Sequence, residues 1–218
     1  MYFVQAKASI NLPRRCFTTM KGQKYQAALL NTKTLPISQT ALVQDEDGKP
    51  KIINNMAFPQ LSSGDIMVKT MMVALNPSDY KMGAAFPSPQ AVIGNDFVGT
   101  VVKVHEKTNT DIIMGDVVCG FVHGSNPADK FSGAFAQYVR VPADLVLRVP
   151  VHSKVEYAAS LGLGFATADM ALWNGGLELE LKPEKPKPST DSKPLVVLLY
   201  GASTATGTMI LSCCSSLG

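Results

Sequence analysis

The chain has 218 residues, of which 46% are hydrophobic and 17% charged, as is usual for a folded globular protein and unlike a disordered one. Its formal net charge of +3 is too small to indicate a nucleic-acid-binding surface or an acidic partner. No Cys-x-x-Cys pair occurs among Cys16, Cys119, Cys213 and Cys214, so we predict neither a disulfide framework nor a closed zinc site, and a reducing, cytoplasmic compartment is favoured.

The N-terminal segment 1–22 contains basic side chains but neither Asp nor Glu, and the first acidic residue of the chain is Asp45. Acid-poor, arginine-containing starts occur in organellar transit peptides, whereas a secretory signal would need an apolar core that this segment lacks. We expect residues 1–22 to form a disordered extension. A targeting signal, or a translation start at Met20, stays open as an alternative.

The region 23–150 contains short apolar runs that alternate with turns rich in Gly, Pro, Asn and Asp. Runs of this length and spacing are typical of a small antiparallel β-barrel. The predicted strands cover residues 25–30, 41–44, 51–53, 65–75, 97–105, 116–122 and 134–141. We therefore expect an all-β domain over 23–150.

The pattern changes to a helical one after Pro150, and residues 151–181 are predicted to form connecting helices. Ser153 and Glu156 have the Ser-x-x-Glu spacing of a capping box, which predicts a helix start there. Gly162 and Gly164 are predicted to interrupt this helix, which then resumes across 167–173. The following residues, 182–194, are rich in Pro and Lys and predict an exposed loop.

The last part of the chain, 195–218, begins with an apolar run at 195–200 that predicts a strand buried in a parallel sheet. A glycine-bounded, hydroxyl-rich loop follows at 201–207, and a helix is predicted to begin near Ala205. Free backbone N–H groups and the positive end of the helix dipole favour a phosphate at such a place. The side chains that could add hydroxyl donors are Ser203, Thr204 and Thr206.

A membrane anchor is the alternative interpretation of 195–218, because the segment contains no charged side chain and is long enough to span a bilayer. Its centre, Gly-Ala-Ser-Thr-Ala-Thr-Gly-Thr, and its Ser-Cys-Cys-Ser-Ser end are too polar for a span. We predict no membrane segment.

In this order, the barrel, helices and glycine loop resemble the medium-chain dehydrogenase/reductase family, in which a GroES-like domain precedes a Rossmann domain. The resemblance rests on Ala74-Leu-Asn-Pro-Ser-Asp-Tyr-Lys81, Gly94-Asn-Asp-Phe-Val-Gly99, Gly115-Asp-Val-Val-Cys-Gly120, Gly133-Ala-Phe-Ala-Gln-Tyr138 and Thr167-Ala-Asp-Met-Ala-Leu172. The Gly201–Gly207 loop is most similar to that of fungal trans-acting enoyl reductases that serve polyketide synthases. The resemblance implies a fold with both α+β and α/β character. It consists of a GroES-like β-barrel at 23–150 and, at 195–218, the first strand, loop and helix of a C-terminally truncated Rossmann domain.

Zinc is used by many members of this family, and the resemblance allows its ligand positions to be compared. Where zinc-dependent relatives have a ligand Cys, this chain has Asn76-Pro-Ser-Asp79, and where they have Gly-His-Glu it has Gly94-Asn95-Asp96. The histidines, at 105, 123 and 152, are scattered along the chain. We predict an enzyme without a metal.

The resemblance implies hydride transfer from NADPH to the double bond of an α,β-unsaturated thioester. Lys81 matches the family's active-site lysine and Thr167 a position near the nicotinamide or the substrate carbonyl, so these two are the candidate catalytic residues. Asn76 and Asp79 are expected to support Lys81, and Tyr80 either donates a proton or packs. The candidate cofactor-binding residues are Gly201, Ser203, Thr204, Ala205 and Thr206.

The expected partners are a small-molecule or carrier-bound substrate and a polyketide synthase. Two alternatives stay open at this point. A quinone or alkenal reductase would share the zinc-free barrel and the hydride chemistry, and a truncated chain could also be inactive.

Overall fold

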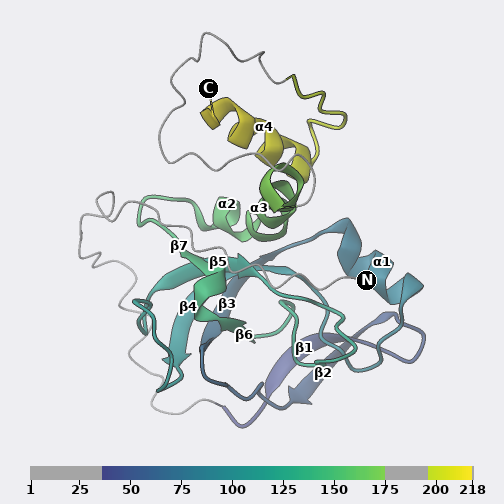
Figure 1. Cartoon of the computed structure of the whole chain (residues 1–218). Helices are drawn as coiled ribbons and strands as arrows, with labels where there is room; N and C mark the ends of the chain where they lie inside the picture. The colour runs from purple at the N-terminus through teal and green to yellow at the C-terminus, as the bar shows by residue number, and fades with distance from the viewer. Residues whose placement is uncertain (1–35, 175–195, 218) are drawn as a thin grey trace.

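The computed structural model describes residues 36–174 and 196–217, in which the β-strands form two antiparallel sheets (Figure 1). The smaller sheet pairs β1 (Gln39–Gln44) with β2 (Pro50–Met56). The larger sheet has the strand order β6-β3-β4-β5-β7. Its members are β3 (Asp65–Ala74), β4 (Asp96–Val104), β5 (Val117–Phe121), β6 (Tyr138–Pro142) and β7 (Val146–Arg148).

The barrel core forms where apolar side chains of the larger sheet meet inside it, because successive side chains of a strand point to opposite faces. Isolated bridges from Ala41 to Ala136 and from Val43 to Val92 tie the smaller sheet to the rest of the barrel. The largest core cluster includes Ile66, Val68, Phe97, Val101, Val118, Val139 and Val141.

The predicted strands at 41–44, 51–53, 65–75, 97–105 and 116–122 are confirmed with small shifts at their ends. The strand predicted at 134–141 begins only at Tyr138, and the short strand β7 was not predicted. The predictions for 1–22, 25–30 and 182–194 lie outside the described residues.

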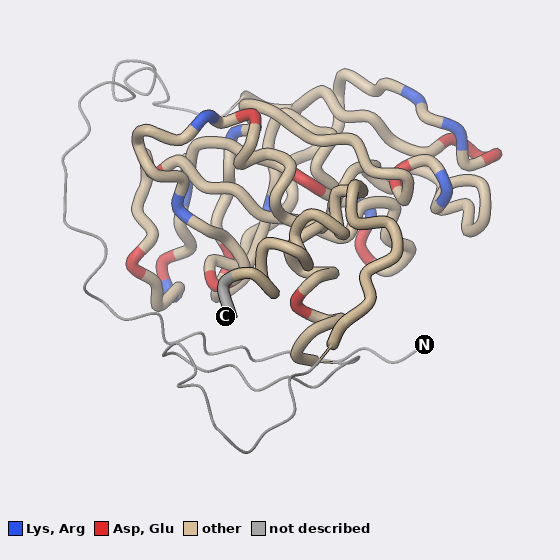
Figure 2. Tube along the Cα trace, turned by 90° about the horizontal axis from the view of Figure 1, so that it is seen from above, with Lys and Arg blue, Asp and Glu red and all other residues tan. Residues whose placement is uncertain are grey.

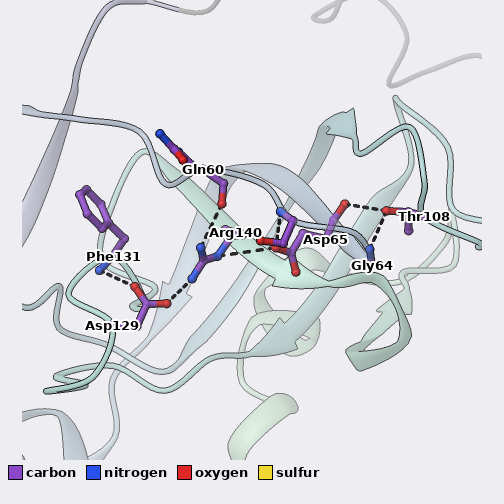
Figure 3. A network of polar contacts seen from close by, with 8 residues as sticks. Gln60, Gly64, Asp65, Thr108, Asp129, Phe131 and Arg140 are labelled. Carbon is purple, nitrogen blue, oxygen red and sulfur yellow. Dashed lines mark hydrogen bonds and ion pairs between the residues drawn. The ribbon is translucent and has the colours of Figure 1, made fainter.

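Arg140 of β6 fastens loops at the end of the barrel where β3 begins (Figure 3). Its guanidinium donates to the carbonyl of Gln60 at 3.0 Å, pairs with the carboxylate of Asp129, and lies 3.9 Å from Asp65 Oδ2. The same Asp65 oxygen accepts the N–H of Ser62 at 2.9 Å. This network lies at the opposite end of β3 from α1 (Pro77–Ala85).

The helices beyond the barrel are α2 (Val155–Ala159), α3 (Gly162–Asp169), a π-helix at Met170–Asn174 and α4 (Ala205–Leu217), while a 3₁₀ turn, Ala143–Leu145, precedes β7. In Figure 1, α3 lies between the barrel and α4, and it contacts both. Within the described residues, no helix has the length and apolar character needed to cross a bilayer.

The predicted capping box at Ser153 and Glu156 is wrong, because α2 begins after Lys154 and no side chain caps it. The helical segment is interrupted at 160–161 and not at the predicted Gly162 and Gly164: Gly162 begins α3, and Gly164 lies within it. A Cβ at Gly162 would lie 2.6 Å from the carbonyl oxygen of Gly120 and 2.8 Å from Asp96 Oδ1. Glycine is needed here because α3 begins directly against the barrel.

The strand predicted at 195–200 is wrong for its described part, since 196–199 has no regular secondary structure and a turn follows. A strand forms only beside a neighbour that completes its backbone hydrogen bonds, and the described sheets offer none at this segment. Val196 and Leu198 are 87% and 94% exposed as a result. The helix predicted near Ala205 is confirmed as α4.

Candidate active site

Lys81 lies on α1, a helix that the sequence patterns predicted as a turn because Asn-Pro and Ser-Asp are turn formers. The helix starts with Pro77, whose fixed φ suits the first helical position. Asp79 Oδ2 accepts the backbone N–H of Asn76 at 2.7 Å, and the N–H of Asp79 donates to the carbonyl of Asn76 at 3.0 Å. These reciprocal bonds hold the first turn of the helix that carries Lys81.

The Lys81 side chain is exposed, and it forms no hydrogen bond or ion pair with another part of the chain that the structure describes. Its neighbour Tyr80 is 66% exposed, so its ring is not packed into the core. Both groups are accessible to a substrate.

Asn95 fixes α1 to the barrel through its side-chain amide. Its Nδ2 donates to Asp79 Oδ1 and to Ser78 Oγ, the latter at 3.2 Å. Its Oδ1 accepts the N–H of Gly124 at 3.2 Å. The Nδ2 atom of this amide therefore holds the start of α1, while its Oδ1 atom holds the loop after β5.

Asp96, the first residue of β4, uses its two carboxylate oxygens for two different helices. Oδ2 accepts a hydrogen bond from Asn76 Nδ2 at 2.9 Å, and Oδ1 accepts the backbone N–H of Leu163 at 2.6 Å. Asn76 precedes α1, and Leu163 lies in the first turn of α3. Asp96 thus joins the starts of both helices to the barrel.

Burial raises the pKa of both carboxyls of this cluster. The pKa of Asp79 lies above its usual value of 3.8 because desolvation outweighs the hydrogen bonds from Asn76 and Asn95. Desolvation also raises the pKa of Asp96, and the nearby charge of Asp79 adds to this. Burial, followed by the charge of Asp96, raises the pKa of the Cys119 thiol to about 11.

The positions compared with zinc ligands come together as a cluster of amides and carboxylates. Among the described residues, no group of three or more His, Cys, Asp and Glu side chains could hold a metal ion. The side-chain amides of Asn76 and Asn95 donate hydrogen bonds to the carboxylates of Asp96 and Asp79. The groups beside these carboxylates are therefore N–H donors and not the lone pairs that a metal ion would need. The zinc-free character of the enzyme stays a prediction.

Thr167 lies on α3, where its Oγ1 donates to the carbonyl of Leu163 one turn earlier, at 2.7 Å. This is the bond that a mid-helix threonine commonly makes. The side chain is exposed, and its oxygen accepts no hydrogen bond from a described residue.

The loop before α4 is organised by Thr204. Its Oγ1 accepts the N–H of Gly207 at 3.0 Å, as an N-cap residue does, and donates to the carbonyl of Gly201 at 2.8 Å. Gly201 has a φ of 85°, which favours glycine, and a Cβ on Gly207 would overlap the carbonyl of Gly201. The Thr204 hydroxyl is therefore used inside the loop.

Unlike the hydroxyl of Thr204, the donor groups of the neighbouring residues Ser203, Ala205 and Thr206 are not used inside the loop. No hydrogen bond within the described part of the chain uses the hydroxyls of Ser203 and Thr206 or the N–H groups of Ala205 and Thr206. These donors lie at the N-terminal end of α4, where the helix dipole is positive.

The helix α3 brings the loop and the barrel together. Gly164 of α3 faces α4 closely: a Cβ there would lie 3.6 Å from Met209 Cγ and 3.8 Å from the backbone of Ala205. The structure thus connects the helices of Lys81 and Thr167 through Asp96, and connects Thr167 to the loop helix through Gly164. No contact between Lys81 and Thr167 themselves is found among the described residues.

The importance of Asp96 was not predicted from the sequence, where it was considered only as part of the segment that corresponds to Gly-His-Glu in zinc-dependent relatives. The available signal was a carboxylate inside the apolar run Ala91-Val-Ile-Gly-Asn-Asp-Phe-Val98. A charged side chain in such a run is buried and must have hydrogen-bond partners.

The comparisons with known proteins agree with this geometry. Residues 62–151 match the alcohol dehydrogenase GroES-like domain. The trans-enoyl reductase ccsC of Aspergillus clavatus is 42% identical over 184 residues, which cover 83% of this chain and 49% of that protein. The trans-enoyl reductase TwmE of Talaromyces wortmannii is 44% identical over 188 residues, covering 82% of this chain and 50% of that protein.

The chain belongs to the medium-chain dehydrogenase/reductase family. It spans about half the length of the curated family members that it matches. The fold expected from the sequence, a GroES-like barrel followed by part of a Rossmann region, is confirmed except for the strand predicted at 195–200.

Solved structures of the family share this fold. An alcohol dehydrogenase superfamily protein from Novosphingobium aromaticivorans superposes with a TM-score of 0.64 at 24% identity, covering 83% of this chain and 51% of that one. A mycobacterial protein solved in complex with NADPH has a TM-score of 0.58 at 24% identity, covering 83% and 50%. At this level of identity the likeness concerns the fold alone.

Proposed function

We propose that the protein is an enoyl reductase that transfers a hydride from NADPH to the double bond of an α,β-unsaturated thioester. The observation that carries this proposal is the identity of 42% and 44% to two trans-enoyl reductases over more than four fifths of the chain. The arrangement of the helices supports it, because α1 and α3 are joined through Asp96 and α3 packs against α4.

The loop 201–207 fits the phosphate groups of a nicotinamide cofactor. The backbone N–H groups of Ala205 and Thr206 and the hydroxyls of Ser203 and Thr206 are available as donors, and the helix dipole favours negative charge beside them. Gly201 has no side chain to block a close approach. The complex of a structural neighbour with NADPH supports this choice of cofactor.

We assign the chemistry to side chains of α1 and α3. When bound, NADPH supplies the hydride that adds to the β-carbon of the substrate. Negative charge then develops on the thioester carbonyl oxygen, and the ammonium group of Lys81 stabilises it. The α-carbon takes a proton, which the exposed phenol of Tyr80 can donate. Thr167 orients the carbonyl or the nicotinamide.

The substrate class we propose is a carrier-bound polyketide thioester, delivered by a polyketide synthase. The trans-enoyl reductases that this chain resembles support that choice, and the exposure of Lys81 and Tyr80 is compatible with a substrate presented by a carrier protein. The spacing of the cysteines in the sequence, which contains no Cys-x-x-Cys pair, supports action in the reducing cytoplasm.

The proposal is tested by steady-state oxidation of NADPH with crotonyl thioesters by the purified protein. We expect turnover with thioesters bound to a carrier, and weaker turnover with NADH. Quinones and alkenals serve as competing substrates in the same assay. A preference for quinones or alkenals would replace the proposed activity with a different reductase activity, and absence of any NADPH oxidation would contradict it.

A further inference from the structure

Asp96 is only 1% exposed, and its carboxylate is the point where the two candidate catalytic helices meet the barrel. We propose that Asp96 is a positioning residue that fixes α1, with Lys81, relative to α3, with Thr167, in the geometry that turnover requires. The inference rests on the proposed function, because it assigns a role to Asp96 in that reaction. Asp96 itself touches neither substrate nor cofactor in this role.

The two hydrogen bonds require an acceptor on each side of one short side chain. Oδ2 faces the Asn76 amide and Oδ1 faces the Leu163 N–H, so both oxygens must accept. The Leu163 N–H lies in the first turn of α3, where helix geometry provides no internal partner and a negative charge is favoured. Asp96 therefore satisfies a group that α3 cannot satisfy itself.

The close approach of α3 makes this link rigid. Gly162 packs against Gly120 and Asp96 so tightly that a Cβ would leave only 2.8 Å to Asp96 Oδ1. On its other side, α3 packs against α4 (Figure 1). Gly164 of α3 lies opposite Met209 and Ala205 there. A shift of α3 relative to Asp96 would consequently also move the loop helix α4.

Asp79, the other buried carboxylate, has a different role. It accepts hydrogen bonds from Asn76 and Asn95 and makes no hydrogen bond to α3. Asp79 therefore holds α1 alone, whereas Asp96 holds α1 and α3 in one arrangement.

The test compares Asp96→Asn with the matched control Asp65→Asn. In D96N, the new NH₂ group must face either the Leu163 N–H or the Asn76 amide, so one acceptor is lost without a change in size. Asp65 lies on the neighbouring strand and also accepts a backbone N–H, that of Ser62. It is at the far end of β3, about 30 Å from Ala74 along the strand.

We expect D96N to lower kcat for the enoyl thioester on the order of 10- to 100-fold at saturating NADPH, with a smaller change in KM, because misplaced catalytic groups slow the chemical step. The measurement is made at a temperature where circular dichroism shows both variants folded. D65N should lower the unfolding midpoint and leave kcat unchanged. A folded D96N with the kcat of the wild type would overturn the proposal.

A second variant, Asn76→Ser, covers the case in which D96N does not fold. Serine keeps a favoured N-cap residue but is too short to reach Asp96. The two hydrogen bonds between Asp79 and position 76 involve only the backbone N–H and carbonyl of position 76, so this substitution retains them. We expect N76S to lower kcat in the same direction, and an unchanged kcat in this variant would also overturn the proposal.

Amide hydrogen exchange separates this inference from the proposed function. D96N should speed exchange at Leu163 and in the first turn of α3, whereas D65N should not. If the wild type does not reduce enoyl thioesters, the proposed function fails, and exchange alone then decides whether Asp96 holds α3. Unchanged protection of Leu163 in folded D96N would overturn the link whatever the activity.

Discussion

Lys81 owes its accessibility to its place on a short helix whose first turn is held by other residues. Asn76 and Asp79 form the hydrogen bonds of the helix start, so the lysine is not needed for them. An exposed lysine without a described partner contributes little to stability. Its replacement therefore separates catalysis from folding.

We predict that Lys81→Met lowers kcat/KM for an enoyl thioester by about 10²- to 10³-fold, the usual loss when one stabilising donor is removed from a developing oxyanion. The unfolding midpoint should not change. The matched control is Lys107→Met, another exposed lysine, which lies in the loop after β4. Equal activity of K81M and K107M in steady-state assays would remove Lys81 from the reaction.

The buried position of Cys119 lowers the reactivity of its thiol. It is 3% exposed on β5, and burial together with the charge of Asp96 raises the pKa of its thiol to about 11. Since the thiolate is the reactive form, about 10⁻³ of this thiol is ionised at pH 8, compared with about 10⁻¹ for a thiol with the ordinary pKa of 9.0.

We predict that iodoacetamide at pH 8 leaves Cys119 unmodified in the native protein during a time that modifies it fully in urea. Peptide mass spectrometry provides the measurement. Because the raised pKa exists only in the fold, ionising this thiol costs stability as the pH rises: its contribution is complete below the unfolded pKa and is lost as the pH passes about 11. Fast labelling of Cys119 in folded protein at pH 8 would show that β5 is not buried as described.

At the scale of elements, the hydroxyl groups of Thr204 and Ser203 at the start of α4 have different roles, one in the structure of the helix and one in the proposed ligand binding. Thr204 caps the helix, while Ser203 makes no hydrogen bond with a described residue. Adjacent residues of similar chemistry therefore have separable roles.

We predict that Thr204→Val destabilises α4 by about 1 kcal/mol, because the N–H of Gly207 loses its acceptor. Amide exchange of residues 205–208 should become faster. Ser203→Ala should leave this exchange unchanged and weaken NADPH binding by about tenfold, as expected for a lost hydrogen bond to a charged group. If S203A alone speeds the exchange, the two roles are assigned the wrong way round.

The elements show which features the sequence could predict. Strands such as β3 and β4 could be predicted because their apolar runs end at turn residues. The helix α4 could be predicted because the loop Gly201–Gly207 leads into it. The helix α1 was missed, since Asn-Pro-Ser-Asp favours both a turn and a helix start. The strand at 195–200 failed because strands depend on partners that local sequence does not contain.

The candidate site was predictable in a similarly limited way. Lys81 and Thr167 were identified by family resemblance, and the support of α1 by Asp79 followed from turn chemistry. The hydrogen bond from Leu163 to Asp96 joins residues 67 positions apart, which no local pattern reveals. The positioning role of Asp96 therefore became visible only in the fold.

At the scale of the whole molecule, the charged side chains are unevenly distributed along the described chain. The described charges lie on the barrel, its loops and the helices α1, α2 and α3, whereas residues 196–217 carry none (Figure 2). Val196, Leu198, Tyr200 and Leu211 are among the exposed apolar side chains of this uncharged part. An apolar surface without charges to oppose contact favours association.

We predict that the 218-residue chain self-associates in a concentration-dependent way, and that Val196→Lys combined with Leu198→Lys weakens this association at least about tenfold. Burying either side chain is worth about 1.5–3 kcal/mol, and a lysine at the contact removes that gain and adds repulsion. Sedimentation velocity over a range of concentrations measures the effect.

The matched control is Ile37→Lys, since Ile37 is 100% exposed but lies on the segment before β1. This change removes an equally exposed apolar side chain and adds the same charge, so a general effect of charge on solubility would make I37K behave like the V196K/L198K variant. Association that persists in I37K and falls only in V196K/L198K assigns the contact to the segment before α4. A wild-type chain that stays monomeric at every concentration and unfolds cooperatively would contradict the prediction, because the exposed side chains at 196 and 198 would then be tolerated in water without a partner.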